Sequence, residues 1–197
     1  WFFDERYGIS AEGMFGSVAA RNDSNVFIGN PVYFSWKLIG EQELLVPITK
    51  PDELAITMKT TAPNPSAIES RASTINKITW HEPYVKWGYN TPDWKGASWW
   101  PTSFSLAKRR VWVVEGIPRD PYYSYGRFIG YFDKKTPIGY YKVIYDRSGE
   151  YWRTVINGEL LPRAEDGSRT WKMVSGIVFR DDKQNMTNTM DVIGPNN

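Results

Sequence analysis

The stretch YSYGRFIGYFDKKTPIGYYKVIYDRSGEYWRTV, residues 123–155, decides the fold. It contains two segments rich in aromatic and β-branched residues, 126–133 and 140–146, and most of a third, 150–157. KKTPIG separates the first two segments, and DRSG (146–149), with Asp first and Gly last, is a turn by its chemistry. Consecutive strands joined by short turns make an antiparallel meander, so this stretch predicts three neighbouring strands.

Further strand patterns extend this meander on both sides. They are YFSWKLIG (33–40), RRVWVVEGI (109–117), TWKMVSGIVFRD (170–181) and an edge strand in the tail NMTNTMDVIG (185–194). Helical patterns are short: PDELAITMK (51–59) and PSAIESRAS (65–73) each place Pro at a first helical position. We predict a mainly β (α+β) fold: a curved antiparallel meander sheet or half-barrel, with a few short helices, in a single domain over residues 1–197.

The composition excludes several function classes. The chain has no cysteine and one histidine, His81, so thiolate chemistry and Cys- or His-rich metal sites are excluded and no cofactor is expected. The net charge of +2 gives no concentrated basic footprint for nucleic acid. No apolar run is long enough to cross a bilayer, so we expect no spanning segment. The chain begins at Trp1 with no signal peptide, and we expect residues upstream of it to exist.

Large apolar side chains recur on one parity of each predicted strand. Because successive side chains alternate across a strand, these sets can share one face of a sheet. The candidate ligand-binding residues on this face are Phe34, Trp36, Leu38, Trp112, Val114, Phe128, Phe132, Tyr141, Trp152, Trp171 and Ile177. They can equally form an ordinary core. So many strands with so few helices leave the face short of cover, which favours a lipid, a lid or another chain as its partner.

The segment 80–101 carries tryptophans among Pro, Gly and Asn without a period, which indicates a long ordered loop. Its candidate lid or interface residues are Trp80, Trp87, Trp94, Trp99 and Trp100. The rings can also stack on sugars, but no carboxylate pair or Asn/Asp cluster stands beside them in the sequence. Packing as a lid or as an interface is therefore favoured.

Catalytic motifs are weak. Glu41 and Glu43 share a strand face and could mimic paired acids. No phosphate loop, GxSxG or metal-ligand spacing occurs. The Lys108–Arg110 triplet and the Asp181–Asp182 pair fit solvated strand ends. We therefore predict a protein that is not an enzyme.

Two segments, NPVYFSWKLIGEQELLVP (30–47) and RRVWVVEGIPRDPYYSYGRFIGYFDKKTPIGYYKVIYDRSGEYWRT (109–154), resemble the DUF1329 family of bacterial envelope proteins. The second also resembles the C-terminal half of the LolA/LolB-like lipoprotein-sorting superfamily. This resemblance implies a half-barrel with a hydrophobic concave face, in the periplasm or at the outer-membrane periphery. It also implies that the chain is the C-terminal part of a longer precursor, with 80–101 as an insertion.

Three functions remain open from the sequence. The first is a non-catalytic carrier that holds a lipid, a lipoprotein acyl chain or another apolar small molecule against the aromatic face. The second is a structural subunit that packs this face on another envelope protein chain. The third is a carbohydrate-binding protein or enzyme. The sequence itself names neither the ligand nor the oligomeric state.

Overall fold

The computed structural model describes residues 23, 25–49, 57–60, 75–79, 85–136, 138–160, 163–164 and 173–191. Two short 3-10 helices lie among them, η3 (Pro31–Tyr33) and η4 (Gly88–Asn90). The strands are β1 (Phe34–Thr49), β2 (Thr57–Thr60), β3 (Ile75–Thr79), β4 (Phe104–Pro118), β5 (Arg127–Asp133), β6 (Gly139–Tyr145), β7 (Tyr151–Leu160), β8 (Arg163–Ala164), β9 (Met173–Asp181) and β10 (Met186–Asp191). None of the described helices is long and apolar enough to span a membrane.

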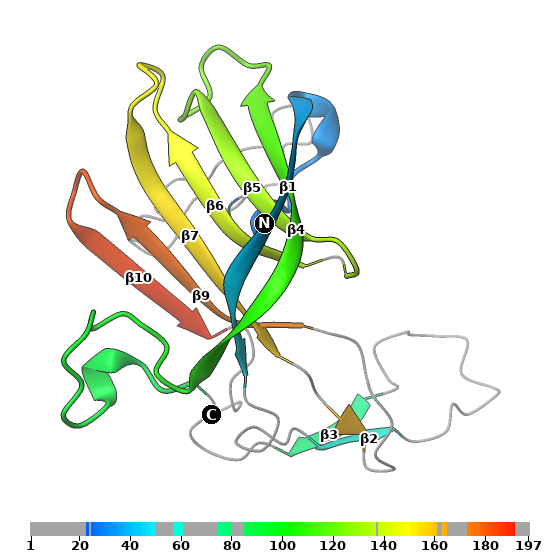
Figure 1. Cartoon of the computed structure of the whole chain (residues 1–197), viewed down its shortest axis with the longest axis vertical. Helices are drawn as coiled ribbons and strands as arrows, with labels where there is room; N and C mark the ends of the chain where they lie inside the picture. The colour runs from blue at the N-terminus through cyan, green and yellow to red at the C-terminus, as the bar shows by residue number, and fades with distance from the viewer. Residues whose placement is uncertain are drawn as a thin grey trace.

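Seven of these strands form one curved sheet in the order β1-β4-β5-β6-β7-β9-β10. In Figure 1 the long, twisted β1–β4 ribbon lies beside β5, and the sheet continues through β6 and β7 to β9 and β10. The last residues of β1 also reach β7, where Ile48 pairs with Glu159. The sheet therefore curls into a partial ring, which confirms the predicted curved antiparallel meander.

Local turn chemistry explains the meander. The β6–β7 turn is held by Asp146, whose carbonyl accepts from the Gly149 N–H and whose carboxylate accepts from the Glu150 N–H. Gly149 has a φ of +87°, a conformation that favours glycine. At the β5–β6 turn, the Asp133 carboxylate accepts from the N–H groups of Lys135 and Thr136. The predicted DRSG turn is confirmed.

Most strand predictions are confirmed, and one helix prediction is wrong in part. The tail forms β10 at the edge of the sheet, while β1 and β4 extend well beyond the predicted runs. Residues 57–59 of the predicted helix 51–59 belong to β2, which pairs with β3 and β8. Pairing with two strands outweighs the weak helical signal there. The rest of that helix and the predicted helix 65–73 lie outside the described residues.

The strand register corrects the predicted face at β6. Phe128 pairs with Ile144 and Gly130 pairs with Lys142, whereas Tyr141 pairs with Tyr131. Tyr141 therefore lies on the opposite face of the sheet from Phe128, and the prediction that the two share a face is wrong. The sequence misleads because the core-facing position of β6 holds a lysine, Lys142, while its neighbour is aromatic. A register shift next to Tyr131 further interrupts the alternation.

Trp152 is displaced from the regular alternation in a similar way. Ile144 pairs with Arg153 and Tyr145 pairs with Tyr151, so Trp152 is the extra residue of a bulge in β7. Its indole N–H donates to the Asp181 carboxylate at 3.0 Å, and the Arg153 guanidinium lies 3.7 Å from its ring. Trp152 thus packs on the buried Arg153–Asp181 ion pair and at the edge of the core.

Candidate functional apolar strip and cationic groove

The predicted apolar face divides into a covered part and an open part. Three of its residues, Phe34, Phe128 and Ile177, are fully buried. Trp36 and Leu38 are 38% and 59% exposed. Trp171 lies outside the described residues. The division shows which of the predicted binding residues a ligand could reach.

Aromatic rings from elsewhere in the chain cover the buried part. The ring of Phe27 stacks on Phe128 with the ring centroids 5.9 Å apart, and it meets Phe34 edge-on at 5.1 Å. Tyr123 meets Phe34 edge-on at 5.4 Å, and Tyr125 contacts Phe128 at 6.2 Å. Such offset and edge-on pairs add to the stability gained by burial. The segment before β1 and the β4–β5 loop therefore cover this part of the apolar face.

A buried ion pair fixes the covering segment to the sheet. The Lys142 ammonium donates to the Asp23 carboxylate at 2.6 Å and to the Tyr125 hydroxyl at 3.0 Å, and it lies 4.2 Å from the Phe128 ring. Burial lowers the pKa of Lys142, and the carboxylate of Asp23 opposes that shift. Burial, and then the charge of Asp23, raises the pKa of Tyr125. Lys142 and Tyr125 are therefore structural groups that hold the covered part together.

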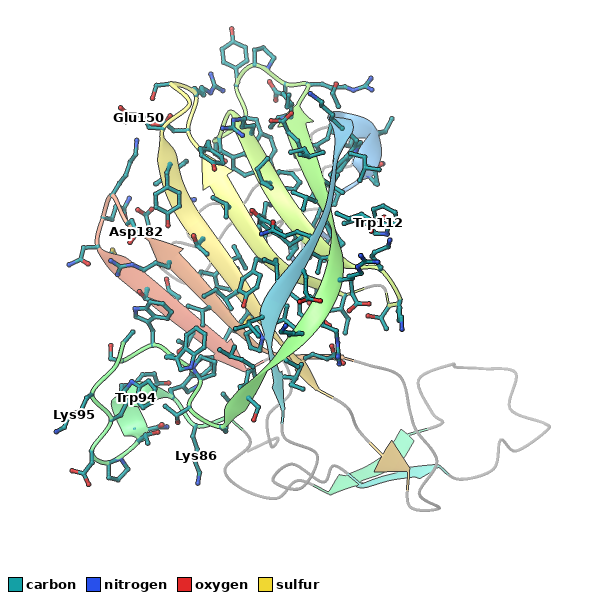
Figure 2. The ribbon with its side chains drawn as sticks, in the orientation of Figure 1. Lys86, Trp94, Lys95, Trp112, Glu150 and Asp182 are labelled. Atoms are coloured by element: carbon teal, nitrogen blue, oxygen red, sulfur yellow. The ribbon has the colours of Figure 1, made fainter. Side chains whose placement is uncertain are left out.

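The open part is a strip across β1, β4 and β5, which we call the apolar strip: Trp36, Leu38, Trp112, Val114 and Phe132. Trp36 lies at its border, because its ring also packs against Phe27 and Phe128 of the covered part. Leu38 pairs with Val114, and Trp112 pairs with Phe132, so these side chains share one face. The three residues on β4 and β5 are half-buried. Figure 2 shows the Trp112 ring projecting from the side of the β1–β4 ribbon. The strip has the exposure that a binding surface for an apolar group requires.

A cationic groove adjoins the apolar strip. A cavity of about 500 Å³ is lined by Lys108, Arg109, Arg110, Asp133, Lys134 and Lys135. The Lys134 ammonium lies 4.2 Å from the centroid of the Trp112 ring, so it belongs to the groove and touches the strip. Arg110 stands two residues before Trp112 on the same face of β4. Apolar and cationic surfaces therefore meet here.

Some of the groove's charges are balanced and others are not. Glu41 pairs with Lys134 at 2.5 Å, and Glu43 pairs with Lys108 at 3.2 Å. Each glutamate thus has its own lysine, so the predicted acid pair is tied up in ion pairs. Among the residues that the structure describes, Arg110 and Lys135 have no carboxylate partner. These two cations are the ones that an anionic ligand could engage.

A buried polar cluster lies next to the groove and shares Arg109 and Asp133 with its lining. The Tyr140 hydroxyl lies within hydrogen-bonding distance of two carboxylates, Asp133 at 3.1 Å and Glu159, and can donate its one proton to either. The Arg109 guanidinium lies 3.8 Å from the Asp133 carboxylate and 4.0 Å from that of Glu159. Burial, followed by the hydrogen bond to Glu159, raises the pKa of Tyr140. The cluster holds Arg109 in place at the point where β1 reaches β7.

The described part of the tryptophan-rich segment is an ordered loop that docks on the far end of the sheet. Trp87 is 3% exposed and packs against Gly176 of β9. The Trp94 ring lies against Gly88 and Gly96, and its N–H donates to the Ala97 carbonyl at 2.8 Å. Trp99 and Trp100 are half-buried and meet edge-on, with ring centroids 6.2 Å apart. Trp80 and His81 lie outside the described residues.

The described residues of the loop contact β9 and β10, as in the packing of Trp87 on Gly176 and the 3.4 Å approach of the Tyr89 hydroxyl to that of Thr189. No group of three or more potential metal ligands is found among the described residues. Sequence reasoning missed the groove cations as site residues because the basic triplet 108–110 has the pattern of a solvated strand start. It also gave no sign that Lys134, beyond β5, meets the ring of Trp112.

A curved antiparallel sheet with a partly filled apolar face defines the class of fold. A family model described as "Protein of unknown function (DUF1329)" matches residues 11–187, and the chain belongs to this family. No curated protein matches the chain. Among solved structures, it is similar to a Vibrio parahaemolyticus domain described as an outer membrane lipoprotein-sorting protein, with 17% identity and a TM-score of 0.34. That match covers 45% of this chain and 38% of the Vibrio chain.

Proposed function

We propose that this protein is a non-catalytic carrier that binds an amphiphile, with the apolar chain along the apolar strip and the anionic head in the cationic groove. The observation that carries the proposal is the junction of the two surfaces at Trp112 and Lys134. An acyl chain with a carboxylate or phosphate head has the matching order of groups. The covered part of the face, filled by Phe27 and its neighbours, serves as the wall behind the ligand.

Burial supplies the affinity in this proposal. Each methylene moved from water onto an apolar surface contributes about 0.8 kcal/mol when fully buried. The strip leaves a bound chain partly open to water, so the gain per methylene is smaller. No bond of the ligand needs to be broken, and the predicted acid pair Glu41 and Glu43 is held by lysines. Binding and release are therefore the whole of the proposed activity.

We place the carrier in the periplasm or at the outer-membrane periphery of a bacterial cell, where lipids need an aqueous carrier. The resemblance of its two motifs to bacterial envelope proteins supports this location. Fractionation of cells that express the full precursor checks it: the protein is expected in the periplasmic or the outer-membrane fraction. Recovery in the cytoplasmic fraction alone would contradict the location and leave the binding proposal standing.

The binding proposal is tested by native mass spectrometry and by displacement of a fluorescent fatty acid. The protein purified without detergent is expected to carry lipid and to bind the probe at micromolar concentration or below. Leu38→Lys places a charge in the strip and is expected to weaken probe binding about tenfold or more. Ile117→Lys is the matched control, because Ile117 is also exposed, in the paired strand, on the opposite face from Val114.

Two results would overturn the proposal. The first is equal probe affinity for Leu38→Lys and Ile117→Lys, which would show that the strip is not the binding surface. The second is a protein that binds neither lipid nor probe but elutes as a stable complex on gel filtration. That result would favour the structural subunit, whose partner chain covers the same face.

A further inference from the structure

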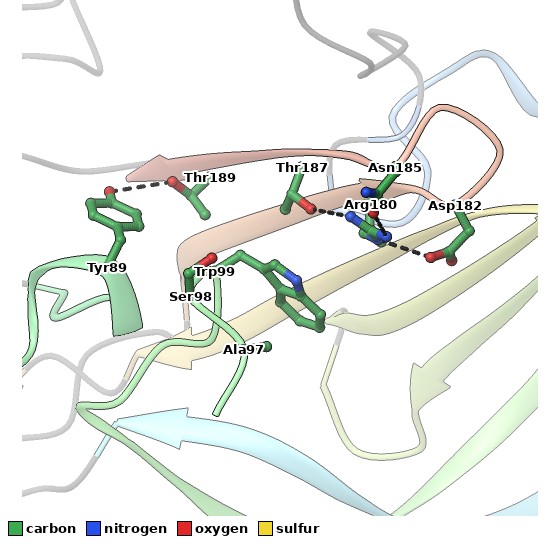
Figure 3. A pocket seen from close by; sticks show the side chains of 9 residues that line it. All are labelled: Tyr89, Ala97, Ser98, Trp99, Arg180, Asp182, Asn185, Thr187 and Thr189. Carbon is green, nitrogen blue, oxygen red and sulfur yellow. Dashed lines mark hydrogen bonds and ion pairs between the residues drawn. The ribbon is translucent and has the colours of Figure 1, made fainter. Parts of the chain in front are cut away.

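A second cavity lies at the other end of the sheet, between the tryptophan-rich loop and the β9–β10 hairpin. Its volume is about 670 Å³, within the range of small-molecule sites. Its walls, drawn in Figure 3, are Tyr89, Ala97, Ser98, Trp99, Arg180, Asp182, Asn185, Thr187 and Thr189. It shares no residue with the apolar strip or the cationic groove. We call it the loop–hairpin pocket.

The polar wall of the pocket is organised around one arginine. The three guanidinium nitrogens of Arg180 donate to Asp182 at 2.9 Å, Thr187 at 3.1 Å and Asn185 at 2.7 Å. In Figure 3 these three side chains gather around Arg180 on the hairpin. The turn itself is fixed by the buried Asp181, which accepts from the Gln184 N–H at 2.9 Å. The hydrogen-bonding groups are therefore held in place before a ligand arrives.

The charge in this wall is balanced. The hydrogen bond from the Tyr151 hydroxyl, and then that from Arg180, lowers the pKa of Asp182, so the carboxylate is ionised beside the guanidinium. Three of the five N–H groups of Arg180 already donate to neighbours, and its positive charge is paired with Asp182, so a phosphate or carboxylate would have to compete with that carboxylate. The pocket is thus built for a neutral ligand. Its polar lining, in turn, is unsuited to an acyl chain.

The groups left to face a ligand are hydroxyls and an amide. Asn185 accepts through its oxygen, so its amide N–H groups can donate, and the hydroxyl of Thr187 accepts from Arg180 and can donate its own proton. Ser98 adds a third side chain of this kind. Such an array matches a ligand with many hydroxyl groups.

Two aromatic rings complete the pocket. Trp99 stands beside the polar wall, and Tyr89 stands near Thr189 at the other end (Figure 3). Tyr89 is 62% exposed, yet its ring is backed by the buried Trp87 in a stacked arrangement, 6.5 Å between centroids and 11° between planes. Rigid rings present a flat apolar surface at little cost in side-chain entropy. The C–H faces of a pyranose ring fit such a surface, while its hydroxyls reach the hydrogen-bonding groups.

We infer that the loop–hairpin pocket is a binding site for a neutral saccharide, with Trp99 as the stacking platform and Asn185 and Thr187 as hydrogen-bonding partners. This site is separate from the proposed lipid surface. It assigns the tryptophan-rich loop a role in ligand recognition in addition to packing. The Asn and Asp groups that are missing beside the tryptophans in the sequence come from the β9–β10 hairpin.

The experiment measures binding of neutral oligosaccharides to the whole chain. Maltotriose, cellotriose and the trimer of N-acetylglucosamine serve as probes, followed by saturation-transfer NMR and by tryptophan fluorescence. At least one trimer is expected to bind. Trp99→Ala is expected to weaken that binding about tenfold or more, because the stacking surface is lost. Thr187→Val removes one hydroxyl at nearly constant shape and is expected to weaken it about fivefold.

Two controls separate the pocket from the rest of the surface. Tyr122→Ala removes an exposed ring in the β4–β5 loop, which does not line the pocket, and is expected to leave saccharide binding unchanged. Leu38→Lys, which disrupts the apolar strip, is also expected to leave it unchanged. If Trp99→Ala does not fold, as judged by circular dichroism, Thr187→Val carries the test alone. Binding by none of the trimers, equal binding by Thr187→Val and the unmodified chain, or displacement of the trimer by inorganic phosphate would each overturn the inference.

Discussion

The covered and open parts of the apolar face differ in what the chain places on them. Phe27 packs over Phe34 and Phe128, and the buried ion pair between Lys142 and Asp23 holds the segment that carries Phe27 against the sheet. On the open part, Leu38 is 59% exposed, and the Trp112 ring is met by the ammonium of Lys134. A ring in a strand is thus core or binding surface according to which distant segment reaches it. The amino-acid type alone does not decide.

Mutations in the covered part and in the open part should therefore change different properties of the protein. Residues of the covered part should determine the free energy of unfolding and contribute nothing directly to binding. Residues of the open part should do the reverse. The four predictions below test that division, from the largest expected effect on the protein to the smallest.

Asp23→Leu is expected to lower the free energy of unfolding by about 3–5 kcal/mol, because it leaves the fully buried Lys142 ammonium without its counter-charge. Urea denaturation followed by fluorescence measures the change. The double variant Asp23→Leu/Lys142→Met is expected to recover most of the loss, since it removes both charges and keeps the apolar volume. A loss below about 1 kcal/mol in the single variant would contradict the view that this pair fixes the covering segment.

Phe128→Ala is expected to lower the free energy of unfolding by at least about 3 kcal/mol, because the ring is fully buried among Phe27, Phe34 and Tyr125. Leu38→Ala, on the open part, is expected to change it by about 0.5 kcal/mol or less. The same denaturation experiment compares the two. Similar losses for both variants would remove the distinction between the covered and open parts.

The extent to which the sequence predicts this arrangement depends on the range of the interactions. The β5, β6 and β7 strands could be predicted because their turns are fixed locally, by Asp133 between β5 and β6 and by Asp146 and Gly149 between β6 and β7. The face of Tyr141 could not, because burial of the adjacent Lys142 depends on Asp23, far earlier in the chain. From sequence alone, a lysine within a strand is expected to face solvent unless its buried counter-charge is known. The strand alternation therefore failed at the residue whose partner is distant.

The candidate sites follow the same rule. Trp36, Leu38, Trp112, Val114 and Phe132 could be selected from strand parity, since pairing of β1, β4 and β5 keeps them on one face. Parity could not tell that Phe34 and Phe128, on the same face, are covered. The loop–hairpin pocket was beyond sequence reasoning altogether, because Trp99 and Arg180 come from separate segments and Asp182 has the pattern of a solvated strand end. Only tertiary contact places them together.

Acid should weaken the Arg153–Asp181 pair next to the covered part in a defined direction. Burial alone would raise the pKa of Asp181, but hydrogen bonds from the Gln184 N–H and from Arg153 outweigh it and lower the pKa below its usual value. A depressed carboxyl pKa gives stability that is present above the pKa of the unfolded chain and is lost as the pH falls towards the lower folded value. The contribution of Asp181 should therefore fade below about pH 4.

Asp181→Asn isolates that contribution. At pH 7 it is expected to lower the free energy of unfolding by about 1.5–3 kcal/mol, the range for hydrogen bonds to charged groups. The gap between the unmodified chain and the variant should stay constant from pH 7 to pH 5 and narrow below about pH 4. Asp182→Asn, at an exposed position, provides the comparison at the next residue. A gap that widens on acidification would contradict the sign of the shift.

The smallest effect concerns the head group at the edge of the open part. Arg110→Gln/Lys135→Gln removes the two groove cations that have no carboxylate partner among the described residues. Because exposed charges interact weakly in water, the affinity for a fatty acid is expected to fall only a few-fold, and the loss should shrink as salt is added. The fatty alcohol of equal chain length should bind both proteins equally, since its head carries no charge. An equal loss for acid and alcohol would mean that the groove shapes the strip without reading the charge of the ligand, and the carrier would then select for chain length alone.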